Sequence, residues 1–482
     1  MSLKTKTISG LMWSFSDLIA NQGIRAIMQI VLARLLLPED FGIIGMITIF
    51  IVLSQAIVDS GFKNALIREN NSTQEDYSTV FYFNLLMAML LYLVLFVSAP
   101  VISNFFREPQ LILMVRVLSL VVLINSFGII QSTLLIKKIN FKTQTKINVI
   151  SSLIAGLIAI ICAYLGFGVW SLVIQNLLMQ LIQSLLLCLL NKWIPSLVFS
   201  INSFKRLFGF GWKLLASGLI NTLYQNLYYL IIGRAFSVVD LGYYTNSRRF
   251  SDVAAHSVTT AVQKVSFPVL SSIKENENQL KSGYEKIIKN AVYITFPMMT
   301  GLAAVANPLF HLLLGSKWEQ SIIYFQILCI TGMLYPLHAI NLNILHVKGR
   351  SDIFLGLEVG KKVLSIMLIA AVLYFKLGVL GLLWVGALNS VLAYLLNSYF
   401  SAELLNYSTF DQIKDITPSF ASAILMGIIV YFTGLFMPFG NLPTLIIQVL
   451  SGVLTFIVLS KVFKIRELDT LYRLFANLVN RT

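Results

Sequence analysis

Charged residues are scarce in this chain. They make up 12% of its 482 residues, whereas hydrophobic residues make up 57%. A soluble protein carries charge at about 25% of its positions, so most of this surface must face something other than water. No polar stretch between the apolar runs reaches the ~50 residues of a small globular domain, which argues against a separate soluble enzyme domain.

Cysteine is nearly absent as well. Cys162, Cys188 and Cys329 all fall inside apolar runs without the close spacing of metal ligands, so we interpret them as packed thiols. We predict no metal site and no cofactor. The basic N-terminus leads into an apolar segment too long for a signal peptide, with no small-residue cleavage pattern, so we expect it to be retained.

Continuous apolar runs recur from one end of the chain to the other, each long enough to cross a hydrocarbon core of about 30 Å. Their continuity, in place of alternation, argues against a β-barrel. We therefore predict an all-α integral membrane protein with about fourteen transmembrane helices. The predicted segments are 8–36, 41–60, 79–102, 110–136, 145–165, 169–190, 208–235, 240–263, 289–314, 321–346, 353–375, 378–400, 417–437 and 442–463.

Basic residues are distributed unequally between the two sets of loops. The loops on the side of the N-terminus hold most of them, while the opposite loops hold only Arg107, Lys317 and Lys376. By the positive-inside rule, both termini are expected in the cytoplasm. The net charge of +15 then follows from topology and from anionic lipid headgroups, and we predict no nucleic-acid partner.

Part of the chain repeats at an offset of about 200 residues. The matched residues are Asn21 with Asn221, Arg34 with Arg234, Asp40 with Asp240, Gly42 with Gly242 and, at a larger offset, Pro100 with Pro308. We expect two parallel six-helix lobes related by a pseudo-two-fold axis along the membrane normal, with a cavity between them. The predicted divisions are an N-terminal lobe 1–190, a cytoplasmic linker 191–207, a C-terminal lobe 208–400, and two additional helices with a basic cytoplasmic tail at 401–482.

Polar residues recur at four-residue spacing in three predicted helices, which aligns each set along one helical face. Lipid cannot solvate such faces, so we expect them to line the cavity. Arginine suits a phosphate because it stays charged and offers a planar fork of donors, so the cavity should favour an anionic head such as a diphosphate or an acidic sugar. The predicted substrate-binding residues are Asn21, Arg25, Gln29, Asn221, Gln225, Arg248 and Arg249.

Several of these charged residues could instead have structural roles. Arg25 could form a buried ion pair with Asp17 or Asp252, and Arg248 or Arg249 could snorkel to the outer interface. His256 could serve in helix packing. Arg34 and Arg234 could bind lipid headgroups or pair with Asp40 and Asp240, and Glu358 could pair locally with Lys361 or Lys362.

Three stretches carry a family resemblance: LARLLLPEDFGIIGMITIF with VDSGFKNALIRENN after it, NLYYLIIGRAFSVVDLGYYTNSRRF, and HVKGRSDIFLGLEVGKK. Together they resemble the polysaccharide flippases of the multidrug/oligosaccharidyl-lipid/polysaccharide exporter superfamily, most closely its O-antigen, colanic-acid and teichuronic-acid exporter branch. The resemblance implies two six-helix lobes plus two extra helices, in the bacterial cytoplasmic (inner) membrane. It implies a transporter, not an enzyme.

The substrate implied by the resemblance is an undecaprenyl-diphosphate-linked oligosaccharide. It would be flipped from the cytoplasmic to the outer leaflet by alternating access, for lipopolysaccharide or other surface polysaccharide biosynthesis, with membrane lipids and other polysaccharide-assembly proteins as partners. Related flippases hold the diphosphate with cationic residues of the first, second and eighth helices. Arg25 and Arg248 or Arg249 match that arrangement, but the predicted second helix lacks a matching cation.

Ion coupling, to H+ or Na+, is less clearly marked. Relatives often have an acid where this chain has Tyr228, so the predicted coupling residues are instead Asp17, Asp59 and Asp252. An ion-coupled drug or metabolite antiporter of the same superfamily is the alternative function, but such a cavity is usually acidic and the arginines argue against it. A glycan polymerase or glycosyltransferase would need a large outer loop or a catalytic acidic motif, and neither is evident.

Overall fold

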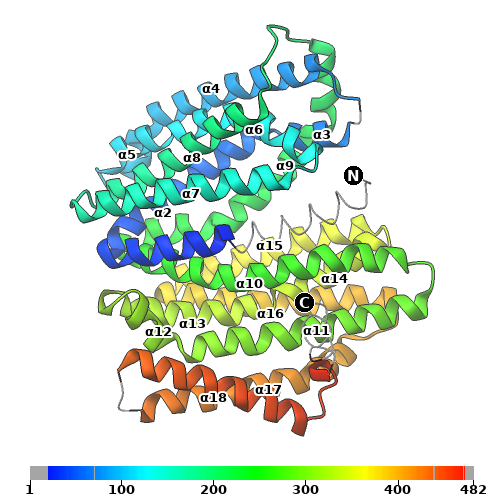
Figure 1. Ribbon diagram of the computed structural model, residues 1–482. Coiled ribbons are helices and arrows are strands. Elements are labelled where there is room, and N and C mark those ends of the chain that lie inside the picture. The colour runs from blue at the N-terminus through cyan, green and yellow to red at the C-terminus, as the bar shows by residue number, and fades with distance from the viewer. Residues whose placement is uncertain (1–19, 70, 438–439, 470–471, 473–482) are drawn as a thin grey trace. The chain divides into compact units, whose positions relative to one another are not determined.

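The computed structural model describes residues 20–69, 71–437, 440–469 and 472 (Figure 1). Across these residues every regular element is a helix, which confirms the predicted all-α class. Contacts group the chain into two compact units, 1–245 and 246–482. The boundary falls inside α10 (Val238–Ser272). The preceding helix α9 (Ile201–Ala235) packs on α2 (Pro38–Asp59) and belongs to the first unit. The lobe boundaries drawn from the repeat stay a prediction.

The first unit is a bundle of antiparallel helices. Its first helix occupies residues 20–35, and α2 and α9 have the bounds given above. The other helices are α3 (Phe62–Arg68), α4 (Gln74–Phe106), α5 (Leu111–Leu118), α6 (Leu120–Lys137), α7 (Phe141–Tyr164) and α8 (Val169–Asn191), and α10 (Val238–Ser272) begins in this unit.

The second unit continues α10 and adds the remaining helices. These are α11 (Glu277–Ala304), α12 (Ala306–Leu313), the 3-10 turn η1 (Ser316–Trp318), α13 (Glu319–Met333), α14 (Tyr335–Val347), α15 (Ser351–Tyr374), α16 (Gly378–Leu405), α17 (Thr409–Phe436) and α18 (Asn441–Val462). The last two helices, predicted as additions to the repeat, form an antiparallel pair in which α17 packs along α11.

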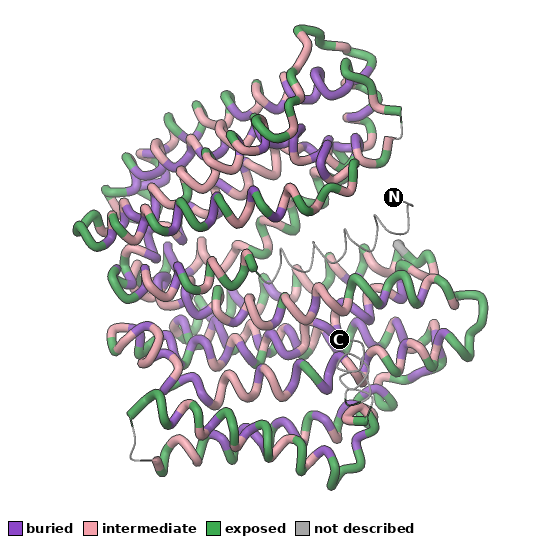
Figure 2. The backbone as a smooth tube through the Cα atoms, viewed as in Figure 1, coloured by how far each residue is buried: buried purple, intermediate pink, exposed green. Residues whose placement is uncertain are grey.

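Nine helices within the described ranges are long and apolar enough to span a membrane, or ten if the bent pair α11 and α12 is one span. The outward faces of α4 and α18 are apolar yet exposed (Figure 2). Val97 on α4 is 74% exposed and Leu450 on α18 is 65% exposed, as lipid-facing side chains would be. By contrast α9 and α10, each of 35 residues, carry polar and charged residues along their length, and the 24-residue α15 carries its charged residues in its first half.

The repeat-related residues at 40 and 240 begin matching helices. Asp40 accepts a hydrogen bond from the backbone N–H of Leu37 (2.8 Å) at the start of α2. Asp240 accepts one from the hydroxyl of Ser237 (2.7 Å) at the start of α10. An acid in the first turn stabilises a helix because it lies against the positive end of the helix dipole.

Gly42 and Gly242 lie where these two helix starts cross. A Cβ on Gly42 would overlap the carbonyl oxygen of Val238, and a Cβ on Gly242 would overlap the carbonyl oxygen of Pro38. Gly42 thus meets Val238, four residues before Gly242, and Gly242 meets Pro38, four residues before Gly42. The two backbones approach this closely only because both positions lack a side chain.

Two repeat-related prolines have different local consequences. Pro100 lies inside the continuous helix α4 and cannot donate to the carbonyl of Phe96, four residues earlier. Arg116 supplies the missing donor, because its Nε donates to that carbonyl (3.3 Å) while its guanidinium lies 4.5 Å from the centre of the Phe96 ring. Near Pro308 the helix breaks instead: α11 ends before Val305, three residues before the proline, and α11 and α12 meet at 66°.

Candidate functional site

The stripe on the first helix is anchored to α7 at one end. Arg25 Nε donates to the side-chain oxygen of Asn21 (3.1 Å), and the hydroxyl of Ser152 on α7 donates to the same oxygen (3.0 Å). Gln29 is buried, at 4% exposure, whereas Arg25 is exposed. The structure therefore brings Asn21 and Arg25 together as predicted, but directs Gln29 into the helix packing.

The stripe on α9 is exposed. Asn221 and Gln225 are both exposed, and they lie on one face of α9 at four-residue spacing. One turn further, Tyr228 stacks on Tyr244 of α10 with ring centres 6.0 Å apart. Tyr228, set apart above from the predicted coupling acids, therefore packs α9 against α10.

The stripe on α10 forms its own ion pairs. Arg248 Nε lies 3.3 Å from a carboxylate oxygen of Asp252, and His256 Nε2 lies 3.6 Å from the other oxygen. The His256 ring also lies against Tyr335 of α14, at 5.4 Å between ring centres. Arg249 is exposed. Arg248 is thus hydrogen-bonded to Asp252, His256 lies near the same carboxylate, and Arg249 lies beside this row.

Of the three predicted coupling acids, Asp17 lies outside the described residues. Asp59 is the last residue of α2, and its carboxylate accepts from the backbone N–H of Lys63 (3.3 Å), at the start of α3. This contact gives Asp59 a role in the α2–α3 junction. Asp252 is the partner of Arg248 described above.

A polar network crosses four helices of the second unit, and only its first member was predicted. Lys361 lies 2.5 Å from Glu358 within α15, and donates to Asn397 of α16 (3.1 Å), so the expected local pairing of Glu358 is confirmed. Asn397 is fully buried and contacts His338 of α14 (3.5 Å), and His338 contacts Ser390 (3.0 Å). The network ties α14, α15 and α16 together, and through Ser390 it reaches the Thr331 carbonyl of α13 (3.2 Å).

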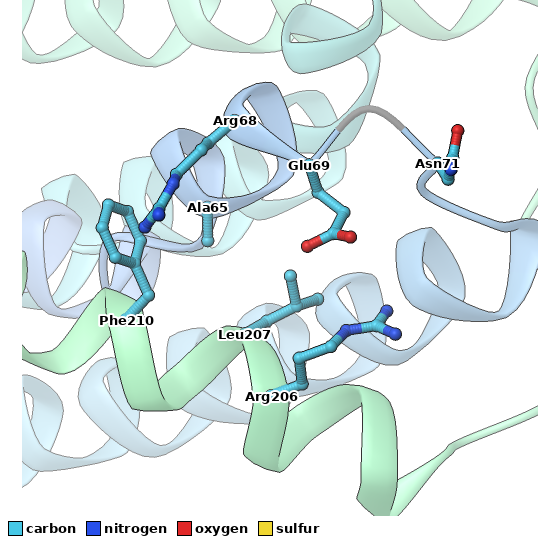
Figure 3. Close-up of a pocket in the computed structure, with 7 residues that line it drawn as sticks. All are labelled: Ala65, Arg68, Glu69, Asn71, Arg206, Leu207 and Phe210. Atoms are coloured by element: carbon cyan, nitrogen blue, oxygen red, sulfur yellow. The ribbon is translucent and has the colours of Figure 1, made fainter.

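A second feature that the sequence did not predict is a cleft of about 420 Å³ in the first unit, formed by α3, the loop after it and the start of α9 (Figure 3). Arg68 and Glu69 line it from above in the figure, and Arg206, Leu207 and Phe210 line it from α9 below. From the sequence, Arg68 and Arg206 are only loop charges. The signal that was available is that Phe210 follows Arg206 by one helical turn.

No metal centre is formed within the described ranges, where no three His, Cys, Asp or Glu side chains come together. The three cysteines are free thiols, with Cys329 buried and the other two partly buried.

Long apolar helices with exposed outer faces, together with polar rows on α9 and α10, are the features of a multi-pass membrane protein. The model of the polysaccharide biosynthesis protein family matches residues 31–323, more than half of the chain. The chain belongs to this family.

Two curated proteins are similar over most of their length. The teichuronic acid biosynthesis protein TuaB of Bacillus subtilis (strain 168) is 28% identical over 433 residues, 89% of each chain. The lipopolysaccharide biosynthesis protein WzxC of Escherichia coli (strain K12) is 27% identical over 463 residues, 94% of this chain and 89% of WzxC.

A solved structure of the lipid II flippase MurJ in an inward closed conformation has the same fold. The TM-score is 0.74 with 15% identity, covering 95% of this chain and 98% of MurJ. This likeness identifies the fold as the one of the MurJ structure, while the division into two six-helix lobes and two extra helices stays a prediction.

Proposed function

We propose that this protein flips a lipid-linked oligosaccharide across the bacterial cytoplasmic membrane for surface polysaccharide assembly. The carrier is undecaprenyl diphosphate, and movement runs from the cytoplasmic to the outer leaflet by alternating access, with both termini in the cytoplasm. Membership of the polysaccharide biosynthesis family, with relatives named for teichuronic acid and lipopolysaccharide biosynthesis, supports the glycan. The fold shared with a lipid II flippase supports flipping.

The observation that carries the proposal is the exposed Arg25. A charged side chain in a membrane helix costs at least ~2.5 kcal/mol on insertion scales, so an arginine at this position is expected to serve a function. Its Nε is oriented by Asn21, which Ser152 holds in turn. A guanidinium fixed in this way is suited to a diphosphate, because the fork of donors is oriented before the ligand arrives.

Ion coupling enters the proposal through α10. Asp252 is the acid that faces both Arg248 and His256, so binding of H+ or Na+ there would change the pairing of Arg248. The predicted substrate-binding residues Asn221, Gln225 and Arg249, all exposed, would contact the glycan or its diphosphate. Membrane lipids and other polysaccharide-assembly proteins are the proposed partners, and no catalytic role is assigned.

A deletion strain tests the proposal. We expect undecaprenyl-diphosphate-linked oligosaccharide to accumulate on the cytoplasmic leaflet, and the intact gene to reverse this. Arg25→Gln should lose at least about tenfold in glycan export, since one charge-assisted pair of hydrogen bonds is removed. Arg34→Gln, the same change nearer the other end of the same helix, is the matched control and should export normally.

Unchanged surface glycan and no accumulation in the deletion strain would refute flipping and favour the antiporter, which uptake assays with cationic drugs would then examine. Equal export by the Arg25 variant and the wild type, at equal amounts in the membrane, would refute the role of Arg25 alone.

A further inference from the structure

The cleft between α3 and α9 lies outside the hydrocarbon core. α9 has 35 residues, so at about 1.5 Å per residue it is roughly 50 Å long. A core of about 30 Å takes some 20 of these residues. Arg234 lies near the far end of α9, so the first two or three turns, with Arg206 and Phe210, extend beyond the core.

The walls of the cleft are held by close packing. A Cβ on Gly61 would overlap the backbone of Gly211, so the α2–α3 junction lies directly on α9. Beneath it, the buried Phe62 contacts the rings of Phe204 and Phe208 of α9, at 5.9 and 6.0 Å between centres. A cleft built on such packing keeps its shape when a ligand enters, which lowers the entropy cost of binding.

Both arginines of the cleft are positioned by neighbours that leave part of them accessible. The guanidinium of Arg68 lies 4.5 Å from the centre of the Phe210 ring, a cation–π arrangement that fixes it over the cleft. Arg206 donates one bond to Asp76, whose side chain is only 1% exposed, and yet the Arg206 side chain remains 53% exposed. Each guanidinium therefore still faces solvent.

The local charge favours an anion. Lys137 lies under the loop and donates to the carbonyls of Leu66 (3.1 Å) and Glu69 (2.5 Å). With Lys137, Arg68 and Arg206 set against Asp76 and Glu69, three positive charges face two negative ones. An anion placed between the two guanidiniums is attracted by both, and outside the core it displaces only water.

Glu69 narrows the class of ligand. Its carboxylate points into the cleft between Arg68 and Arg206 (Figure 3), where it would repel a bare phosphate. A carboxylate does, however, accept hydrogen bonds from hydroxyl groups, and the Phe210 ring offers an apolar face. Arginines, an acceptor and an aromatic ring in one cleft suit a ligand that carries both a phosphate and sugar hydroxyls.

We infer that this cleft binds a sugar phosphate, with the phosphate held by the guanidiniums of Arg68 and Arg206 and a hydroxyl of the adjoining sugar on the Glu69 carboxylate that lies between them. The assignment rests on the proposed function only in naming where the sugar phosphate comes from. It would be the first sugar and the diphosphate of the lipid-linked glycan. On the expected topology the cleft faces the cytoplasm, where it captures the head of the substrate before the transport step.

Glucose 1-phosphate is a suitable probe, with the full-length protein in phosphatidylcholine nanodiscs and binding followed by broadening of the ³¹P NMR signal. We expect Arg68→Gln to weaken binding about tenfold, the effect of losing one pair of charge-assisted hydrogen bonds. Lys205→Gln, an equal loss of charge beside Arg206 but outside the cleft, should bind like the wild type. Arg68→Lys should restore part of the affinity.

Glu69→Ala gives a signature that misfolding cannot produce. It should weaken binding of glucose 1-phosphate, because a hydroxyl acceptor is lost, and strengthen binding of inorganic phosphate, because a repelling charge is removed. Weaker binding of both probes would overturn the assignment. So would equal losses in the Arg68→Gln and Lys205→Gln variants, or no broadening with the wild type.

A lipid headgroup could supply the same phosphate, so the measurement is repeated with phosphatidylglycerol in the nanodiscs. Unchanged binding of glucose 1-phosphate is expected, and its displacement by phosphatidylglycerol would assign the cleft to lipid instead. Transport is measured separately. If variants that no longer bind glucose 1-phosphate still export glycan, the role of the cleft is refuted and the proposed function is not. If the protein binds glucose 1-phosphate but flips no lipid-linked oligosaccharide, the proposed function is refuted and the cleft assignment is not.

Discussion

Gly42→Ala tests the crossing of α2 and α10 most directly. The added methyl group would overlap the Val238 carbonyl, and a backbone carbonyl cannot rotate away as a side chain does. The two helices must therefore separate at their closest point. Overpacking of this kind costs about 1–3 kcal/mol, so we expect the free energy of unfolding to fall by that amount.

Gly242, the glycine on the other helix of this crossing, allows a second test. Gly242→Ala should cost a similar amount, since its Cβ would overlap the Pro38 carbonyl in the same crossing. Once one methyl group has separated the helices, the second meets less resistance. The double variant should therefore lose less than the sum of the two single losses, as expected for residues that share one contact.

Unfolding by SDS in mixed micelles supplies the measurement, with Gly356→Ala as the control. Gly356 lies in the helix α15 and an added Cβ there meets nothing within 4 Å, so alanine should leave stability unchanged or raise it by up to about 1 kcal/mol. Equal midpoints for Gly42→Ala and Gly356→Ala would refute the close crossing. Additive losses in the double variant would refute the shared contact.

Two further predictions concern charge. Lys361→Met should lower the free energy of unfolding by about 1–3 kcal/mol, because Glu358 and Asn397 both lose a donor. This is less than the ~3–5 kcal/mol expected when a fully buried ion pair is broken. Unfolding by SDS measures the loss, and a loss no larger than that of Lys376→Met, in an exposed loop, would contradict the prediction. In a variant without its three cysteines, Lys376→Cys should react with a membrane-impermeant maleimide on intact cells and Lys274→Cys should not; the reverse pattern would invert the predicted topology.

The helices could be predicted because lipid demands long apolar runs, and every predicted segment with described residues coincides with a helix or a pair of helices. The breaks inside three segments were missed. Pro308 and Pro336 could have indicated two of them, since proline clashes with the carbonyl four residues earlier. The third, at Ser119, has no such signal, only a hydroxyl that donates to the Arg116 carbonyl (3.0 Å).

The candidate site was only partly accessible from the sequence, for a similar reason. Four-residue spacing is a local pattern that places residues along one helical face. In the structure Asn21 contacts Arg25 and Arg248 contacts Asp252 along such faces. The cleft depends on contacts between Arg68 and Phe210, residues far apart in the chain. Such contacts follow from tertiary packing, here the glycine contact of Gly61 with Gly211, which no periodicity encodes.

The two repeat-related prolines make the corresponding helices mechanically unequal. α4 runs unbroken past Pro100 because Arg116 supplies the donor that proline lacks, so this rod resists bending. At Val305, three residues before Pro308, the chain turns through 66° between α11 and α12, and a joint where proline removes a backbone donor resists bending less. Halves that share a pattern of residues therefore differ in stiffness, and bending strain concentrates at the joint in the second unit.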